Sequence, residues 1–133
     1  MIRFFTALVF LSIAGLVLQT PAWAYGGGGG SRSSCTKPYF SNEQPAQNAE
    51  VKAVSEVSFT ATDNTATGTL AVKVNGQAVQ LTVTPQSSGR FAVVGKLPQP
   101  VVQVGKVHIG VYGKSKDDCD NQLVYFVTVK PIN

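Results

Sequence analysis

Short runs in which hydrophobic and polar residues alternate fill the chain from Val51 onward. Between residues 57 and 62 every second residue is apolar, which predicts a strand with one buried face. No window shows the sustained spacing of an amphipathic helix. Comparable alternating or β-branched runs cover residues 70–74, 79–83, 90–94, 107–111 and 123–130. We therefore predict an all-β domain, a sandwich of about seven strands.

Turn-forming residues separate these runs. Asn75-Gly76 stands between two alternating runs and predicts a hairpin, because both central residues of such a turn take positive φ. Residues 63–65 and 85–89 predict further loops. Residues 97–100, with two prolines, predict a connection, since proline cannot donate to a central ladder. Residues 114–121 predict a polar turn before the last strand.

The first 24 residues have the pattern of a secretory signal peptide. One arginine precedes an apolar run of about 15 residues, shorter than the roughly 20 that a membrane-spanning helix needs. The run is followed by an A-x-A site, which predicts cleavage between Ala24 and Tyr25. The first residue after that site is not cysteine, so a lipid anchor is not expected. We predict an exported protein, periplasmic or extracellular, without stable membrane insertion.

Residues 25–49 are rich in Gly, Ser, Pro, Asn and Gln and predict a tether and irregular lead-in to a domain at 50–133. The five glycines at 26–30 could suggest a phosphate loop. Such loops follow a strand, open a helix and carry further conserved spacing, none of which is present. A flexible tether is the interpretation we favour.

Composition and charge narrow the partner class only slightly. The chain is 44% hydrophobic and 14% charged, which is typical of one folded domain. Without the signal peptide, ten Lys and Arg remain against seven Asp and Glu. These basic residues are scattered singly, whereas nucleic-acid binders cluster them on one face. We do not expect a nucleic-acid partner.

Two cysteines, Cys35 and Cys119, remain after export. An even number in an oxidising compartment favours a disulfide. A redox pair is the alternative, but such pairs more often have the CxxC spacing. We predict a structural bond that closes most of the domain into one loop.

Several short motifs follow one another in a recognisable order. They are V-K-V-N-G-Q-A-V at 72–79, S-G-R-F-A-V at 88–93, L-P at 97–98, V-G-K-V-H-I-G-V-Y at 104–112, D-D-C-D-N at 117–121 and F-V-T-V at 126–129. Together they resemble the bacterial immunoglobulin-like (Big-type) domains of envelope and surface proteins. The sequence differs from that family in placing a cysteine inside the acidic turn and in its Gly/Ser-rich head. The resemblance implies an immunoglobulin-like β-sandwich more firmly than any function, because family members have diverse roles.

The acidic turn offers oxygen ligands of the kind that Ca²⁺ prefers. The DxDxDG-type spacing is missing, however, and Ca²⁺ needs six to eight oxygens. A solvated turn is the interpretation we favour, and no metal or cofactor is expected. The candidate calcium or loop-contact residues are Asp117, Asp118, Asp120, Asn121 and Asp63.

The only histidine, His108, alternates with apolar neighbours and should face solvent. One histidine outside any hydrolase motif does not indicate catalysis or a transition-metal site. Aromatic residues matter more, because exposed rings provide contact surfaces. Tyr112 and one of Tyr125 or Phe126 should face outward, and Tyr112 and Tyr125 are our candidate contact residues. The single tryptophan, Trp23, lies in the signal peptide.

Three functional hypotheses follow from these features. The first is a non-enzymatic binding or accessory module for a macromolecular partner in the envelope or outside the cell. It would bind through strand edges or through the turns at 63–68 and 114–121. The second is a protein that binds carbohydrate or calcium. The third, a pilin-like subunit, requires an alternating donor strand that residues 25–34 do not provide.

Overall fold

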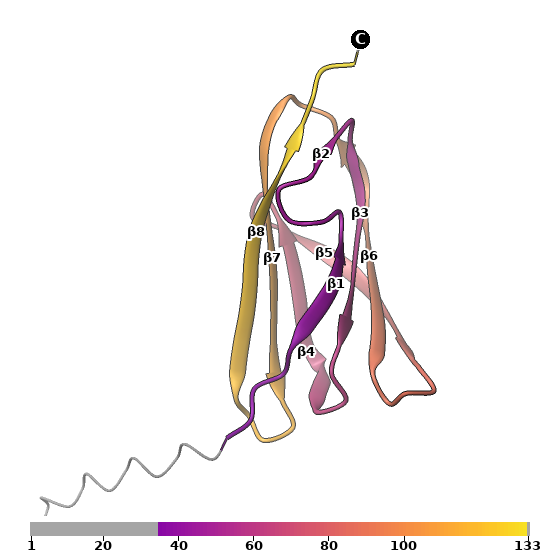
Figure 1. Cartoon of the computed structure of the whole chain (residues 1–133), viewed down its shortest axis with the longest axis vertical. Coiled ribbons are helices and arrows are strands. Elements are labelled where there is room, and N and C mark those ends of the chain that lie inside the picture. Colours follow the sequence, from indigo (N-terminus) through magenta and orange to yellow (C-terminus); the bar gives the residue numbers. More distant parts are fainter. Residues whose placement is uncertain (1–34, 133) are drawn as a thin grey trace, which may run out of the picture. The chain divides into compact units, whose positions relative to one another are not determined.

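The computed structural model describes residues 35–132 as an all-β sandwich of eight strands, which confirms the predicted fold class (Figure 1). The predicted signal peptide, its cleavage site and the glycine tether lie outside the described residues. The strands are β1 (Phe40–Gln44), β2 (Glu50–Val51), β3 (Val54–Ala61), β4 (Thr65–Val74), β5 (Gln77–Pro85), β6 (Phe91–Val101), β7 (Gly105–Ser115) and β8 (Asp120–Val129).

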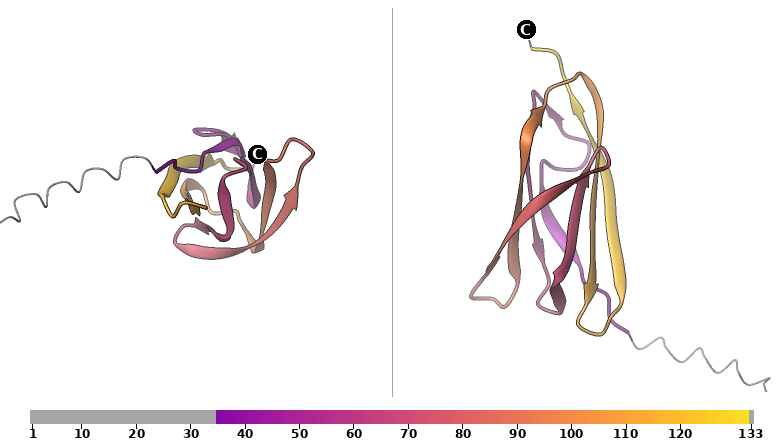
Figure 2. Two further views of the ribbon diagram at one scale, coloured as in Figure 1. Left: turned by 90° about the horizontal axis from the view of Figure 1, so that it is seen from below. Right: turned by 180° about the vertical axis from the view of Figure 1, so that it is seen from behind.

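The strands form one continuous hydrogen-bonded order, β1-β3-β6-β5-β4-β7-β8-β2, that folds into two layers (Figure 2). Strand β5 belongs to both layers. Its first residues, from Gln77 to Val79, pair with β4, and the residues from Gln80 to Pro85 pair with β6. Strand β2 is the one parallel member, paired with the end of β8. The layers therefore meet at β5, and the strand order ends at β1 in one layer and, beyond β8, at the short strand β2 in the other.

The alternating apolar residues of both layers fill the space between them. Val57, Val93, Ile109 and Val127 are fully buried there. Phe40 from β1 packs edge-on against Phe59 from β3, with ring centroids 5.6 Å apart. The period-two pattern thus places one face of each strand in the core, as the sequence predicts.

The predicted hairpin joins β4 to β5. Asn75 and Gly76 have φ values of 49° and 83°, as a type I′ turn requires. Asn75 also binds the neighbouring strand β7. Its N–H donates to the His108 carbonyl (2.9 Å), and its side-chain oxygen accepts from the His108 N–H (2.9 Å). The hairpin therefore fixes the backbone at the centre of β7.

The proline-containing segment 97–100 was predicted as a connection, and this prediction is wrong. Both prolines lie inside β6. In this stretch β6 has run past its pairing with β5, which ends at Lys96, and its register with β3 shifts between Val54 and Glu56. The backbone N–H groups in this part of β6 are not needed for a regular ladder. Proline, which has no N–H group, is therefore tolerated there.

The prediction of an irregular lead-in up to residue 49 missed strand β1. Its residues Phe40–Gln44 pair with β3, with a bulge where Asn42 takes a φ of 55°. Four of its five residues are polar, so only Phe40 gives a hydrophobic signal. The strand forms because Phe40 is buried against the core and because β3 offers a free edge.

The predicted polar turn at 114–121 is shorter in the structure, because β7 continues to Ser115 and β8 begins at Asp120. Ser115 is buried, and its hydroxyl accepts hydrogen bonds from the N–H groups of Asp117 (3.2 Å) and Cys119 (3.1 Å). This side chain satisfies the donors of a tight turn, which lets the strands extend on either side of it.

The predicted Cys35–Cys119 disulfide is present and joins residues 84 apart in sequence, with Cα atoms separated by 5.9 Å. It fixes the lead-in beside the β7–β8 turn. Side chains hold the same segment further: Asn121 donates to the Pro38 carbonyl (2.7 Å), and Asn64 donates to the Lys37 carbonyl (3.2 Å). The lead-in from residue 35 is thus attached to both layers.

Candidate binding face

The outward side of strands β7 and β8 carries a strip of aromatic and apolar side chains between lysines. Residues that pair across these antiparallel strands share a face, and Tyr112 pairs with Gln122 while His108 pairs with Phe126. Val124 is 50% exposed and Phe126 is 37% exposed. We call this surface the outer face; it consists of Lys106, His108, Tyr112, Gln122, Val124 and Phe126.

Tyr112, a predicted contact residue, lies on the outer face and is half-buried. Its ring lies along the strand over Gly110: a Cβ atom at Gly110 would lie 2.5 Å from the Tyr112 hydroxyl oxygen. Glycine at this position therefore lets the ring lie flat on the sheet. Val124, the cross-strand partner of Gly110, continues the apolar surface onto β8.

His108 and Phe126 form the centre of the outer face. Their rings pack edge to face with centroids 4.5 Å apart. The ammonium group of Lys106 lies 5.3 Å from the Phe126 ring centroid, within the range of a cation–π contact. His108 is exposed, as the sequence predicts, and its backbone is fixed by Asn75. The position of this aromatic pair is thus set by the sheet itself.

Tyr125 was the other predicted contact residue, but the structure buries it: only 3% of the residue is exposed. Phe126 is the outward member of this pair. Burial and, to a smaller extent, the charge of Glu43 raise the pKa of Tyr125 to about 12. Gln122, Thr128 and Lys130 share the phase of Phe126, and these polar residues are the sequence signal that identifies the outward side of β8.

Beside the outer face, strand β8 has an open edge. The peptide groups of Phe126, Thr128 and Lys130 point to that edge and bond the segment around β2. Peptide groups alternate along a strand, so those of Gln122 and Val124 point the same way. Within residues 35–132, no strand pairs with β8 beside these two residues. Their donors and acceptors are available to an added strand.

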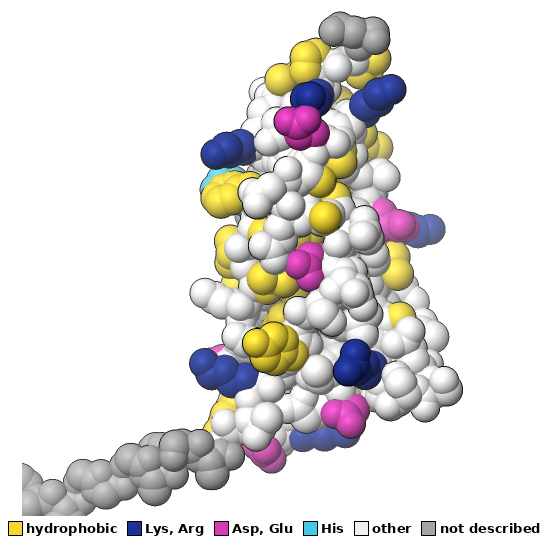
Figure 3. Space-filling view, in the orientation of Figure 1, with side chains coloured by type: hydrophobic (Ala, Val, Ile, Leu, Met, Phe, Trp, Pro, Cys, Tyr) yellow, Lys and Arg dark blue, Asp and Glu magenta, His cyan; other side chains and the backbone are white. Residues whose placement is uncertain are grey.

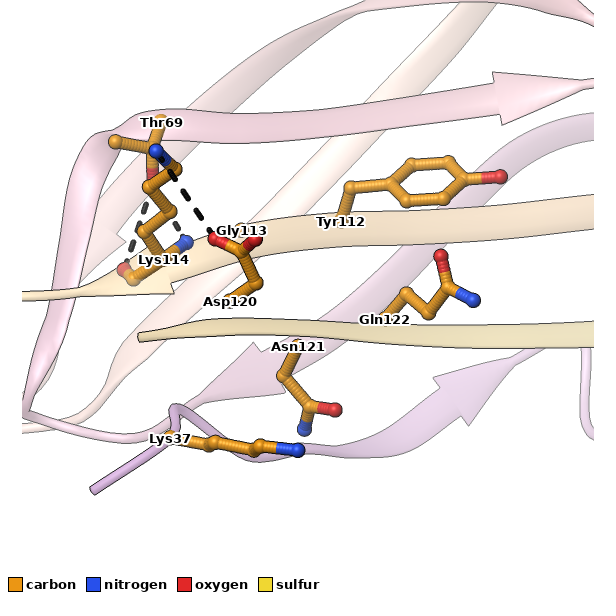
Figure 4. A pocket seen from close by; sticks show the side chains of 8 residues that line it. All are labelled: Lys37, Thr69, Tyr112, Gly113, Lys114, Asp120, Asn121 and Gln122. Atoms are coloured by element: carbon orange, nitrogen blue, oxygen red, sulfur yellow. Dashed lines mark hydrogen bonds and ion pairs between the residues drawn. The ribbon is translucent and has the colours of Figure 1, made fainter. Parts of the chain in front are cut away.

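Two shallow hollows follow this open edge. One, of about 400 Å³, includes Tyr112 and Lys114 on the outward side (Figure 4). The other, of about 350 Å³, includes Tyr39 and Phe40 of the lead-in. Both are also lined by Lys37, Asn121 and Gln122. The hollows therefore extend along β8 from its outer face to the gap between the layers.

The acidic turn does not gather its predicted ligands. Lys114 lies 3.5 Å from the Asp118 carboxylate and 4.0 Å from that of Asp120. Asn121 turns inward to the Pro38 carbonyl, and the Asp63 side chain lies against Gly89 of another turn. Among the described residues, no three His, Cys, Asp or Glu side chains are grouped so that they could hold a metal ion.

The protein is thus a small β-sandwich with an exposed aromatic and apolar surface, the outer face, on β7 and β8. Neither a protein-family model nor a curated protein matches the sequence. Solved structures do match. CopC from Methylosinus trichosporium OB3b has a TM-score of 0.56 and 16% identity, and the match covers 72% of this chain and 96% of that one. PcoC, a methionine-rich copper resistance protein from Escherichia coli, has a TM-score of 0.53 and 17% identity, covering 71% and 100%.

At such identities the likeness establishes the fold alone. Whether this chain could bind copper depends on the side chains that it carries. Methionine, histidine and cysteine are the side chains that favour copper. This chain has one methionine, Met1, and one histidine, His108, and both cysteines form the disulfide. His108 contacts Phe126 and lies near no second histidine. The residues do not fit a copper site of the methionine-rich kind named for PcoC.

Proposed function

We propose that this protein is an exported, non-enzymatic binding module that holds an extended segment of another protein in the envelope or outside the cell. The segment adds to the open edge of β8 as a further strand. Its side chains then contact Val124, Phe126 and Tyr112 on the outer face. Main-chain hydrogen bonds provide the affinity in this mode of recognition, and side-chain contacts provide the specificity.

The proposal is supported most directly by two features that lie side by side, the apolar strip of the outer face and the open edge of β8. The exposed apolar strip on β7 and β8 ends at Gln122 and Val124, whose peptide groups face the open edge. Natural proteins usually block such edges with charges, prolines or cover. Here the stretch from Asn121 to Phe126 contains neither charge nor proline. An unprotected edge beside an apolar face is therefore expected to have an occupant.

Export is supported by the disulfide and by the predicted signal peptide. Structural disulfides persist in oxidising compartments, and this one joins the lead-in to the turn that borders the open edge. The resemblance to bacterial immunoglobulin-like domains agrees with a role in the envelope or at the surface. The bond also fixes the hollow that contains Lys37 and Tyr39.

A second candidate function is binding of a small carbohydrate, and the hollow beside Tyr112 favours it. A half-buried tyrosine ring that lines the hollow, with polar side chains such as Asp120 and Gln122 around it, suits a sugar. Replacing Tyr112 with alanine would then abolish sugar binding in a glycan screen. Strand addition predicts no such ligand.

Capture of partners from an envelope fraction tests the proposal. Gln122→Pro removes a donor that faces the open edge and leaves the β7 ladder intact, and Phe126→Asp places a charge on the outer face. Both variants should lose the captured protein while the melting temperature stays within a few degrees. Thr82→Asp, an exposed position on β5, is the matched control and should capture normally.

Hydrogen exchange on the captured complex gives an independent result. The amides of Gln122 and Val124 should become protected, because they would donate to the added strand. Capture that persists in Gln122→Pro and Phe126→Asp, with no new protection in β8, would refute strand addition at this edge.

A further inference from the structure

One end of the sandwich brings together three turns that are far apart in sequence. Val101 pairs with Val54, Gly105 pairs with Val129, and the Lys130 N–H donates to the Val51 carbonyl (2.8 Å). The β2–β3 turn, the β6–β7 turn and the C-terminal segment are therefore neighbours. We call this end the valine end; its exposed residues are Lys52, Ala53, Val102, Gln103, Val104, Lys130, Pro131 and Ile132.

The valine end exposes apolar side chains that the fold does not use. Val102 is 60% exposed, Val104 is 58% exposed and Ile132 is 73% exposed. They are half of the six large hydrophobic residues that are exposed among the described residues. The space-filling view shows hydrophobic side chains and lysines together at this end (Figure 3). Valines at a turn tip contribute little to stability, since they leave water only if something covers them.

Cationic side chains surround these residues. Lys52 and Lys130 flank the tip, and Lys106 lies just below it at the start of β7. Among the described residues, Glu50 pairs with Lys130 at 2.7 Å in an exposed ion pair. All four aspartates lie at the opposite end, three of them in turns and Asp120 at the start of β8. An exposed ion pair is weak, so Lys130 can turn to an external anion at small cost.

We infer that the valine end docks on an anionic lipid surface. Its valines and Ile132 would enter the interface between headgroups and acyl chains, and the lysines would contact lipid phosphates. Long lysine side chains suit this position because their stems lie along apolar surface while the ammonium group stays in the polar layer. Within residues 35–132 no helix has the length and hydropathy to cross a membrane.

A lipid surface fits this end better than a protein partner does. The tip consists of three short turns from which aliphatic and lysine side chains project. It carries no tryptophan, tyrosine or arginine, the residues that dominate protein interfaces. A bilayer needs no complementary shape and accepts projecting aliphatic residues. The outer face, along the length of β7 and β8, would remain accessible.

Co-sedimentation with vesicles tests the inference on the protein purified after export. Phosphatidylcholine vesicles that contain phosphatidylglycerol should bind the protein, and pure phosphatidylcholine vesicles should bind it at least about tenfold more weakly. Added salt should weaken binding. The double variant Val102→Asn with Val104→Asn should lose about tenfold or more. Lys52→Gln should lose about fivefold, as should Lys130→Gln.

Matched substitutions elsewhere make the test specific. Val124→Asn, at a similarly exposed valine on the outer face, should bind vesicles normally, as should Lys116→Gln at the opposite end. Equal binding to both kinds of vesicle would overturn the inference. So would a loss in Val124→Asn as large as that in the valine-end variant, or a captured protein that depends on Val102 and Val104 without any vesicle binding.

The predicted mature chain lacks tryptophan, so V104W provides a clean optical readout. Its emission should shift to the blue and be quenched by brominated lipids when anionic vesicles are added. V124W should not respond. This result is independent of the partner capture described above, because the outer face and the valine end carry different residues.

Discussion

The turns at the two ends of the sandwich are held in place by different kinds of contact. At the disulfide end, turn polar groups find partners within the chain, through Ser115, Asn64 and Asn121. At the valine end, backbone hydrogen bonds join the turns, and the one side-chain ion pair among its described residues, Lys130 with Glu50, is exposed. The contacts at the disulfide end stabilise the fold. We expect substitutions at the valine end to change the free energy of unfolding very little. Such residues are the more informative about function.

The disulfide should provide the largest single stabilisation. Replacing Cys35 and Cys119 together with alanine releases a loop of 84 residues, which should cost about 4–5 kcal/mol of the free energy of unfolding. Urea denaturation of both proteins measures the difference. A loss below about 1 kcal/mol would mean that side-chain bonds alone hold the lead-in.

High pH should destabilise the protein through Tyr125. The pKa of this residue is 10.0 in an unfolded chain and about 12 in the folded protein, so the unfolded state loses the proton first. Stability should therefore fall as pH rises from 10 to 12, by up to about 3 kcal/mol. Tyr125→Phe should remove this loss. At pH 7 it should cost little, since the buried hydroxyl has no hydrogen-bond partner among the described residues. Denaturation of both proteins across this pH range is the measurement.

Asn121 should contribute a smaller share at the disulfide end. Asn121→Ala leaves the Pro38 carbonyl without its donor and should cost about 1–2 kcal/mol. Gln122→Ala, at the neighbouring exposed residue, should stay within about 0.5 kcal/mol. Thermal unfolding of the two variants compares them, and equal effects would show that the Asn121 bond is unimportant.

The valine end should give the smallest effects on stability. Val102→Ser and Val104→Ser should each change the free energy of unfolding by less than about 0.5 kcal/mol. Val107→Ala, only three residues further along but fully buried, should cost about 2 kcal/mol. Chemical denaturation would detect the contrast. A large loss at Val102 or Val104 would assign these residues a structural role and weaken the comparison of the two ends.

The sequence predicted those parts of the fold that depend on local pattern. Alternation identified the strands with buried faces, and Asn75-Gly76 identified the hairpin. The pattern did not predict β1, because four of its five residues are polar and show no alternation. The strand forms through its pairing with β3, which the local sequence does not encode. The choice of Tyr125 over Phe126 as a contact residue was wrong, although the polar residues at 122, 128 and 130 indicate that Phe126 faces outward. The valine end could not be predicted, because its three turns become neighbours only when the sheet forms.

The most direct test is site-specific photocrosslinking in cells that export the protein. A photoreactive residue at Val124 should form a covalent adduct with one defined polypeptide, and that adduct should disappear when Gln122→Pro is introduced in the same chain. The same residue at Val104 should give lipid adducts and no polypeptide adduct. Absence of a defined polypeptide adduct at Val124, or its persistence with Gln122→Pro, would contradict the proposal that the open edge of β8 binds a partner strand.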